Sequence, residues 1–247
     1  MDPQTRSKLD SYLRLLHRHR GETEGAYDEV ATVYDDFVRV WDQHIAAPAL
    51  TRVNALIEEW VKPGAIVLDA GAGTGKRTLA ILQHSQPEEV IALDASEAML
   101  AVAKSKIHDP RVRFGQGDVR HLPFADNTFD VVVCTWVIEI MDDPRAVVQE
   151  LIRVIKPGGT VIYAFCSLLE GTLGNILKYV MAKSSSKKES PLTHLLSKEE
   201  QPFHRCDSAS LTRFAGGLTT VATVGKCCTV TDEFVACRVR EPQAMLK

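Results

Sequence analysis

The sequence has almost no net charge and no long uninterrupted apolar segment. Its 29 Lys and Arg residues nearly balance 32 Asp and Glu residues, so no overall field attracts nucleic acid or an anionic membrane, and we expect no nucleic-acid partner. The longest apolar stretch, around residues 160–182, is interrupted by Glu170, Asn175 and Lys178, which argues against stable insertion into a membrane. With 45% hydrophobic residues, the composition is that of a soluble globular protein, which excludes disorder, collagen and coiled coil for the whole chain.

The sequence also lacks the cysteine spacing of a metal site and the pattern of a secretory leader. Its six cysteines include no CxxC pair and no Cys/His ligand pattern, so we expect no metal site. The N-terminus carries charged residues where a signal peptide has its apolar segment. We therefore expect a cytoplasmic protein whose thiols are reduced.

Short apolar runs alternate with segments of helical periodicity over most of the chain. The runs are typical of buried strands and lie at 65–68, 90–93, 131–134 and 160–165. The segments with helical spacing are 78–84, 97–107 and 145–155. This alternation predicts an α/β fold, a Rossmann-like doubly wound and mostly parallel sheet with helices on both faces.

The two ends of the chain depart from this alternation. Residues 221–228 and 234–239 are apolar runs with a short connection, which predicts a C-terminal antiparallel hairpin. Residues 1–60 are mostly helical in pattern, and we expect them to form an N-terminal lid before a domain that spans 61–247. Within that domain, an insertion at about 168–210 carries one apolar helical stripe, and we expect it to cap the ligand-binding edge of the sheet.

Three alternating glycines follow the first predicted strand. The strand ends in Asp69, and the glycines come directly before the next helix. Glycines at such a point let a ligand approach the backbone, and the helix N-terminus offers free N–H groups. Lys76 stands where the dinucleotide fingerprint needs a third Gly or Ala, and Arg77 stands where a P-loop needs Ser or Thr. The loop therefore indicates a nucleotide-like ligand of another kind.

Two further carboxylates follow predicted strands. Asp94 ends the second strand beside the glycine turn, where an acid accepts hydrogen bonds from both hydroxyls of a ribose. Asp118 follows another strand, where it could accept from an exocyclic adenine amine while a backbone N–H donates to the ring. Together the two acids predict an adenosine-containing ligand.

Several motifs in register resemble one enzyme family. The chain resembles the class I S-adenosylmethionine-dependent methyltransferases, in particular the small-molecule methyltransferase type 11 group, in VLDAGAGTG at 67–75, LDASEAML at 93–100, GDV at 117–119, LPF at 122–124, FDVVVC at 129–134 and LIRVIKPGG at 151–159. The resemblance covers about residues 25 to 166. It implies a transferase whose cofactor is S-adenosyl-L-methionine.

The resemblance also implies which residues contact the cofactor. The glycine loop would lie near the methionine portion, Asp94 at the ribose and Asp118 at the adenine. The chain after the fourth strand would pass under the cofactor, and an aromatic residue of the lid would cover it. The predicted cofactor-binding residues are therefore Tyr34, Asp69, Gly71, Gly73, Gly75, Asp94, Ala95, Met99, Asp118, Val119 and Cys134.

The family chemistry implies direct in-line methyl transfer to a small-molecule acceptor. The sulfonium is already an activated donor, so no enzyme nucleophile is needed, and the sequence shows no convincing general base. A lipid-like acceptor and a thiophilic one, such as a thiol or an arsenite-like metalloid, are alternatives, the latter because cysteines end neighbouring predicted strands. A non-catalytic S-adenosylmethionine-binding module is a third. The candidate acceptor-binding residues are Trp136, Cys166, His204 and Cys206.

Overall fold

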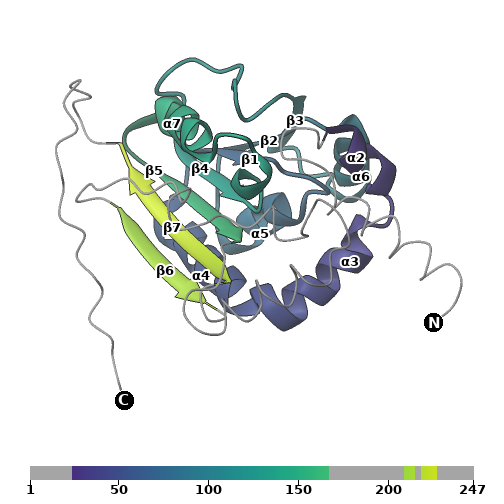
Figure 1. The fold of residues 1–247 in the computed structure, drawn as a ribbon. Helices are drawn as coiled ribbons and strands as arrows, with labels where there is room; N and C mark the ends of the chain where they lie inside the picture. Colours follow the sequence, from purple (N-terminus) through teal and green to yellow (C-terminus); the bar gives the residue numbers. More distant parts are fainter. Residues whose placement is uncertain (1–23, 167–208, 215–217, 227–247) are drawn as a thin grey trace, which may run out of the picture.

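The computed structural model describes residues 24–166, 209–214 and 218–226, which form a mixed sheet with helices on both faces (Figure 1). In these residues the sheet has seven strands in the order β3-β2-β1-β4-β5-β7-β6. The strands are β1 (Ile66–Ala70), β2 (Glu89–Asp94), β3 (Val112–Gln116), β4 (Phe129–Thr135), β5 (Ile155–Cys166), β6 (Ser210–Phe214) and β7 (Thr219–Gly225). The predicted fold class, a mostly parallel Rossmann-like sheet with antiparallel strands near the C-terminus, is confirmed.

Helices precede the sheet and connect its parallel strands. They are α2 (Glu24–Val30), α3 (Tyr34–Trp41), the π-helical η1 (Asp42–Ala46), α4 (Ala47–Trp60), α5 (Lys76–His84), α6 (Glu97–Lys106), the 3-10 turn η2 (Ile138–Ile140) and α7 (Pro144–Val154). Local sequence explains where two of them start. The side chain of Ser96 accepts the N–H of Met99 at the start of α6, and Asp143 caps α7 ahead of Pro144.

The parallel part of the sheet creates an edge suited to ligands. β1 pairs with β2 on one side and with β4 on the other, all in parallel. The strand order therefore reverses beside β1, and the carboxyl ends of β1, β2 and β4 meet where the loops separate. Open α/β sheets bind their ligands at such a switch point.

The antiparallel strands near the C-terminus are present, but their boundaries differ from the expected ones. β7 overlaps the predicted run 221–228, and in the described residues it forms a hairpin with β6, which precedes it. The sequence pattern does not reveal β6, because Ser210, Thr212 and Arg213 give this edge strand little apolar character. The predicted strand 234–239 and residues 168–208 of the predicted cap lie outside the described residues.

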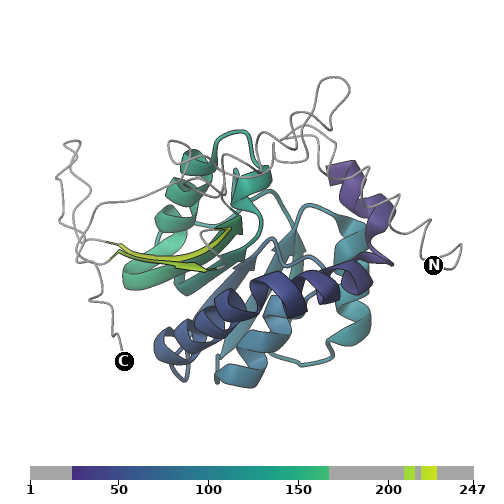
Figure 2. The same ribbon diagram turned by 60° about the horizontal axis from the view of Figure 1, so that its bottom comes forward.

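Side chains on the central strands alternate between two apolar clusters. Leu68 and Val132 face α7 in one cluster, while Val67 and Val133 face α4 and α5 in the other. Figure 2 shows α4 and α5 lying along the sheet on the side opposite α7. Because both faces are covered, these strands are continuous apolar runs rather than alternating ones, which is why they are readily predicted.

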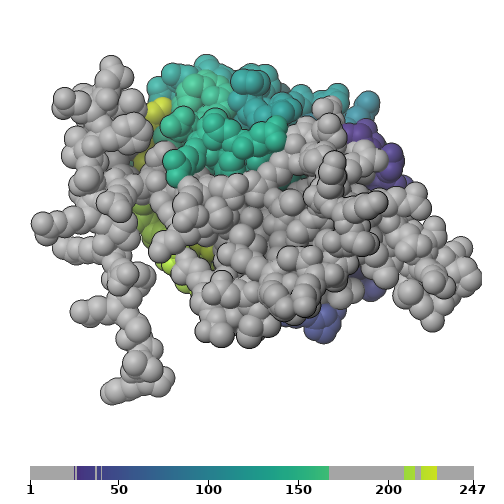
Figure 3. Space-filling view, viewed as in Figure 1, coloured from purple at the N-terminus to yellow at the C-terminus, as the bar shows by residue number. Residues whose placement is uncertain are grey.

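The N-terminal helices run along one face of the sheet and reach its ligand-binding edge. Residues 34–60 form a continuous helical rod of α3, η1 and α4, seen in line in Figure 2. The buried side of α4, including Val53 and Ile57, packs on the sheet. α2 lies beyond the Tyr34 end of this rod, where Val30 and Ala31 pack against Met99 of α6. Part of α2 is visible at the surface in Figure 3. Within the described ranges, no helix combines the length and apolar character needed to cross a membrane.

Candidate functional site

The glycine loop lies at the carboxyl end of β1 and folds against the end of β2. The backbone N–H groups of Gly71 and Ala72 both donate to the carbonyl of Leu93, at 2.8 and 2.9 Å. Gly71 has a φ of +77°, and a Cβ at this residue would lie 2.3 Å from Cγ2 of Val137. The turn therefore requires glycine both for its backbone conformation and for the close approach of Val137.

Asp94 ends β2 and holds the glycine loop from the other side. Its carboxylate accepts the N–H of Gly73 at 2.7 Å and the N–H of Ser96 at 2.9 Å. Burial raises the pKa of this carboxyl above its ordinary value, although these backbone hydrogen bonds act in the opposite direction. A carboxylate has about four lone-pair sites, so Asp94 keeps acceptor capacity for further hydroxyl groups.

Asp118 follows β3 and is paired with Arg120. Nε and Nη2 of Arg120 lie 2.8 and 2.6 Å from Oδ2 of Asp118, and the backbone N–H of Arg120 donates to Oδ1 at 2.8 Å. Burial raises the pKa of Asp118, but the hydrogen bonds from Arg120 outweigh it and the pKa lies below its ordinary value. Asp118 is therefore ionised at neutral pH.

A pocket opens between these loops and the N-terminal helices. It encloses about 790 Å³ of empty space, part of which is open solvent. Its lining combines the carboxylates of Asp94 and Asp118 with an apolar wall that includes Trp136, Val137 and Met141. The pocket can therefore hold a ligand that has one polar, hydrogen-bonding part and one apolar part.

Two tyrosines of the N-terminal helices also line the pocket. The rings of Tyr27 and Tyr34 meet edge to face, with their centroids 6.0 Å apart. Burial raises the pKa of the Tyr34 hydroxyl well above its ordinary value, and the nearby carboxylate of Asp94 raises it further. Tyr34 therefore keeps its proton and can act as a hydrogen-bond donor toward the pocket.

The structure brings most of the predicted cofactor residues together and leaves others apart. The predicted site residues that line the pocket are Tyr34, Gly71, Gly73, Asp94, Ala95, Met99, Asp118, Val119 and Trp136. Asp69, Gly75, Cys134 and Cys166 do not line it, although the first two belong to the strand and loop beside it. His204 and Cys206 lie outside the described residues.

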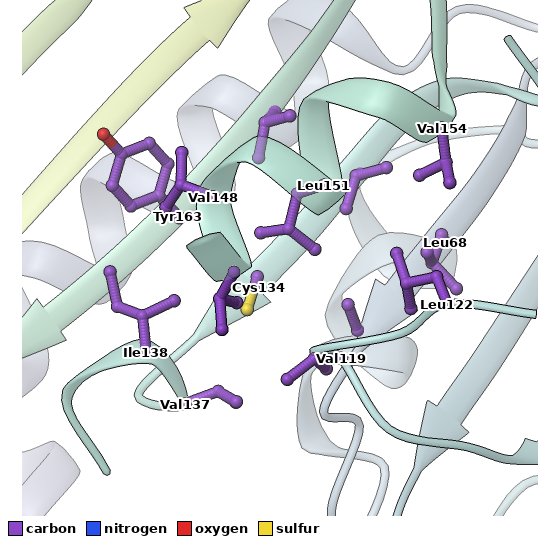
Figure 4. Packing of buried hydrophobic residues seen from close by; sticks show 14 of the residues in the cluster. Leu68, Val119, Leu122, Cys134, Val137, Ile138, Val148, Leu151, Val154 and Tyr163 are labelled. Atoms are coloured by element: carbon purple, nitrogen blue, oxygen red, sulfur yellow. The ribbon is translucent and has the colours of Figure 1, made fainter. Parts of the chain in front are cut away.

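Cys134 and Cys166 lie at the carboxyl ends of adjacent strands, and neither lines the pocket. The thiol of Cys134 lies among apolar side chains such as Val148 and Leu151 (Figure 4). By the alternation along β5, Cys166 shares the opposite face of the sheet with Ala164. Burial raises the pKa of both thiols well above the ordinary value, so both are neutral. The described residues therefore provide no converging pair of thiolates for a thiophilic acceptor.

Sequence reasoning missed the residues that follow β4. Val137, Ile140 and Met141 line the pocket from the turn η2 and its flanks. As single apolar residues they are indistinguishable from core residues in the sequence. The signal that could have found them is their place at the carboxyl end of a central strand, just after Trp136, whose φ of +56° redirects the chain.

Asp69 is a buried acid beside the pocket with one unpaired oxygen. Its Oδ2 accepts a hydrogen bond from Oγ1 of Thr78 at 2.6 Å, whereas Oδ1 has no hydrogen-bond partner among the described residues. Burial raises the pKa of Asp69 to about 6, even though the Thr78 hydrogen bond favours the ionised form. The folded protein therefore holds this proton over a pH range in which the unfolded chain has released it.

Replacing Asp69 with Asn is expected to remove part of the pH dependence of stability. The folded protein binds the Asp69 proton more tightly than the unfolded chain does, because the folded-state pKa is raised. The resulting contribution to stability is fully present below about pH 4 and is lost as the pH rises through about 6. Asn keeps an acceptor for Thr78 and cannot ionise. Urea unfolding at pH 4 to 7 measures the free energy of unfolding of both proteins. Between these two pH values, the native protein should lose on the order of 3 kcal/mol more of it than the variant does. Parallel curves for the two proteins would contradict the assignment.

Comparisons with known proteins relate part of this chain to methyltransferases. Residues 68–163 match the family model described as a methyltransferase domain. A demethylmenaquinone methyltransferase of Clavibacter sepedonicus is 33% identical over 151 residues, which cover 60% of this chain and 59% of that protein. A chloroplastic 2-methyl-6-phytyl-1,4-hydroquinone methyltransferase of Oryza sativa subsp. japonica is 33% identical over 144 residues, which cover 58% of this chain and 42% of that protein.

A solved structure supports the fold. Phosphoethanolamine N-methyltransferase 2 of Haemonchus contortus, in complex with S-adenosyl-L-methionine, has a TM-score of 0.53 and 23% identity, covering 66% of this chain and 38% of that chain. The chain spans less than two thirds of the length of the two curated relatives named above. Residues 68–163 are therefore similar to a methyltransferase domain, in agreement with the motifs of the sequence.

Proposed function

We propose that this protein transfers the methyl group of S-adenosyl-L-methionine, the cofactor of its family, to a small aromatic acceptor of the quinone class. The observation that supports this most is the pocket, which combines Asp94 and Asp118 with an apolar wall. Two relatives are named as a demethylmenaquinone methyltransferase and as a 2-methyl-6-phytyl-1,4-hydroquinone methyltransferase.

The residues present fit the cofactor. Asp94 has the acceptor capacity for ribose hydroxyls, and Asp118 is an ionised acceptor suited to the adenine amine. A Cβ on Gly73 would meet no atom within 4 Å, so there is room beside the glycine loop for the methionine portion. When bound, the cofactor supplies a methyl group that its sulfonium has already activated.

The lining suggests what the protein contributes to transfer. Trp136, Val137 and Met141 would exclude water and orient a flat, apolar ring by contact. The described residues that line the pocket include no histidine, and Tyr34 is held protonated, so neither supplies a general base. An acceptor that is already electron-rich suits such a site, which favours the reduced hydroquinone over the oxidised quinone.

Methyl transfer to defined acceptors tests this proposal. The protein is incubated with methyl-labelled S-adenosylmethionine and one of four acceptors: a water-soluble naphthohydroquinone, its oxidised quinone, a simple thiol or arsenite. We expect label in the hydroquinone only. Label in the thiol or arsenite instead would overturn the acceptor class. No label in any acceptor, despite binding of S-adenosylhomocysteine, would favour the non-catalytic binding module.

A further inference from the structure

Carboxylates of the N-terminal helices contact the elements that surround the pocket. Asp28 of α2 accepts a hydrogen bond from Oγ of Ser96, the N-cap residue of α6. Asp42 of η1 forms an ion pair with Lys76, the first residue of α5. Both contacts join segments that are distant in sequence, and both lie next to loops that carry pocket residues. The N-terminal helices are therefore attached to the ligand-binding edge at more than one point.

Asp35 makes the most extensive of these contacts. Its carboxylate accepts a hydrogen bond from Oγ1 of Thr74 at 2.6 Å and pairs with Nζ of Lys106. The same Nζ donates to the backbone carbonyl of Thr74 at 3.0 Å. Thr74 is the residue between Gly73 and Gly75 and is almost completely buried. Asp35 thus links α3, the glycine loop and α6 in one network.

The network is directly next to an aromatic residue that lines the pocket. Asp35 is the residue after Tyr34, at the start of α3, and Tyr34 lines the pocket and meets the ring of Tyr27. Fixing the carboxylate of Asp35 against Thr74 therefore fixes the backbone that carries Tyr34. Asp35 and Lys106 are partly exposed, at 41% and 31% of their side chains, so added salt should weaken their attraction.

We infer that Asp35 is a positioning residue that holds Tyr34 over the bound cofactor and slows its release. Asp28 and Asp42 hold the same helical segment on either side of this contact. The inference rests on the proposed function, because it requires the pocket to bind S-adenosylmethionine and its product. It concerns the dissociation rate, since Asp35, Thr74 and Lys106 hold the segment that carries Tyr34 but do not line the pocket themselves.

The test is the dissociation rate of S-adenosylhomocysteine from the full chain, measured by stopped flow. Asp35→Asn keeps an acceptor for Thr74 but removes the charge opposite Lys106, and should raise the dissociation rate about 3- to 10-fold with little change in the association rate. Asp36→Asn is the matched control, because it removes the same charge one residue later, from a side chain paired with the exposed Arg39. The control should change the rate by less than about 2-fold.

Two further measurements separate positioning from a general loss of structure. Lys106→Gln should raise the dissociation rate as Asp35→Asn does, and the double variant should be no worse than the weaker-binding single variant. Added salt should speed dissociation from the native protein more than from Asp35→Asn. Equal dissociation rates for Asp35→Asn and Asp36→Asn, or additive effects in the double variant, would overturn the inference. A native protein that does not bind S-adenosylhomocysteine would instead contradict the proposed function.

Discussion

Replacing Asp94 with Ala is expected to weaken S-adenosylhomocysteine binding by about 10- to 150-fold, the usual loss when a charged hydrogen-bond partner is removed. Two effects add. The variant loses the acceptor proposed for the ribose hydroxyls, and it leaves the N–H groups of Gly73 and Ser96 without the carboxylate that they bind at 2.7 and 2.9 Å. The glycine loop should therefore lose its preformed shape as well as its contact with the ligand.

Two companion variants make this result interpretable. Asp94→Asn keeps an acceptor for Gly73 and should preserve the fold while still weakening binding, because it loses the charge and one acceptor oxygen. Asp109→Ala removes a partly buried acid that pairs with Arg111 before β3, away from the pocket lining, and should leave affinity unchanged. Calorimetric affinities of all three variants decide the matter, and an Asp94→Ala protein that binds as tightly as the native one would refute the ribose assignment.

Replacing Gly71 with Ala should cost about 3 kcal/mol or more in the free energy of unfolding and should abolish cofactor binding. The φ of +77° costs an L-residue about 1–2 kcal/mol. The new Cβ would also lie 2.3 Å from Cγ2 of Val137, a packed side chain, and such overpacking costs about 1–3 kcal/mol. Because Gly71 and Val137 both line the pocket, relief of the clash would distort the site itself.

Gly64 supplies the matched control for backbone strain alone. It has a φ of +83°, and a Cβ there would meet no atom within 4 Å. Gly64→Ala should therefore cost only the conformational part, about 1–2 kcal/mol, and leave binding intact. Adding Val137→Ala to Gly71→Ala removes the methyl group that clashes, so the double variant should be more stable than the sum of the single changes predicts. Denaturant unfolding that shows Gly71→Ala and Gly64→Ala equally destabilised would contradict this account.

The fold could be predicted largely because the central strands are buried on both faces. Runs such as Val131–Cys134 are continuous and apolar, and a proline such as Pro144 marks where a helix starts. The edge strand β6 could not be predicted, because one half-buried face leaves a weak pattern. The pairing of β6 with β7 depends on tertiary contacts.

The site residues that follow predicted strands could be predicted from the sequence. The contacts that join distant segments of the chain could not. Asp94 and Asp118 follow strands, so topology alone places them at one edge. The bond between Asp35 and Thr74 spans 39 positions, and no local pattern reveals such a pairing. The convergence of Cys134 and Cys166 was a reasonable expectation from strand ends, but the alternation of side chains separates them.

The central claim is that the pocket at the carboxyl ends of the strands is an S-adenosylmethionine site. Its most direct test is calorimetric titration of S-adenosylhomocysteine into the native protein at neutral pH. We predict saturable binding with one ligand per chain. The absence of saturable binding to a protein that unfolds cooperatively, and is therefore folded, would contradict the account.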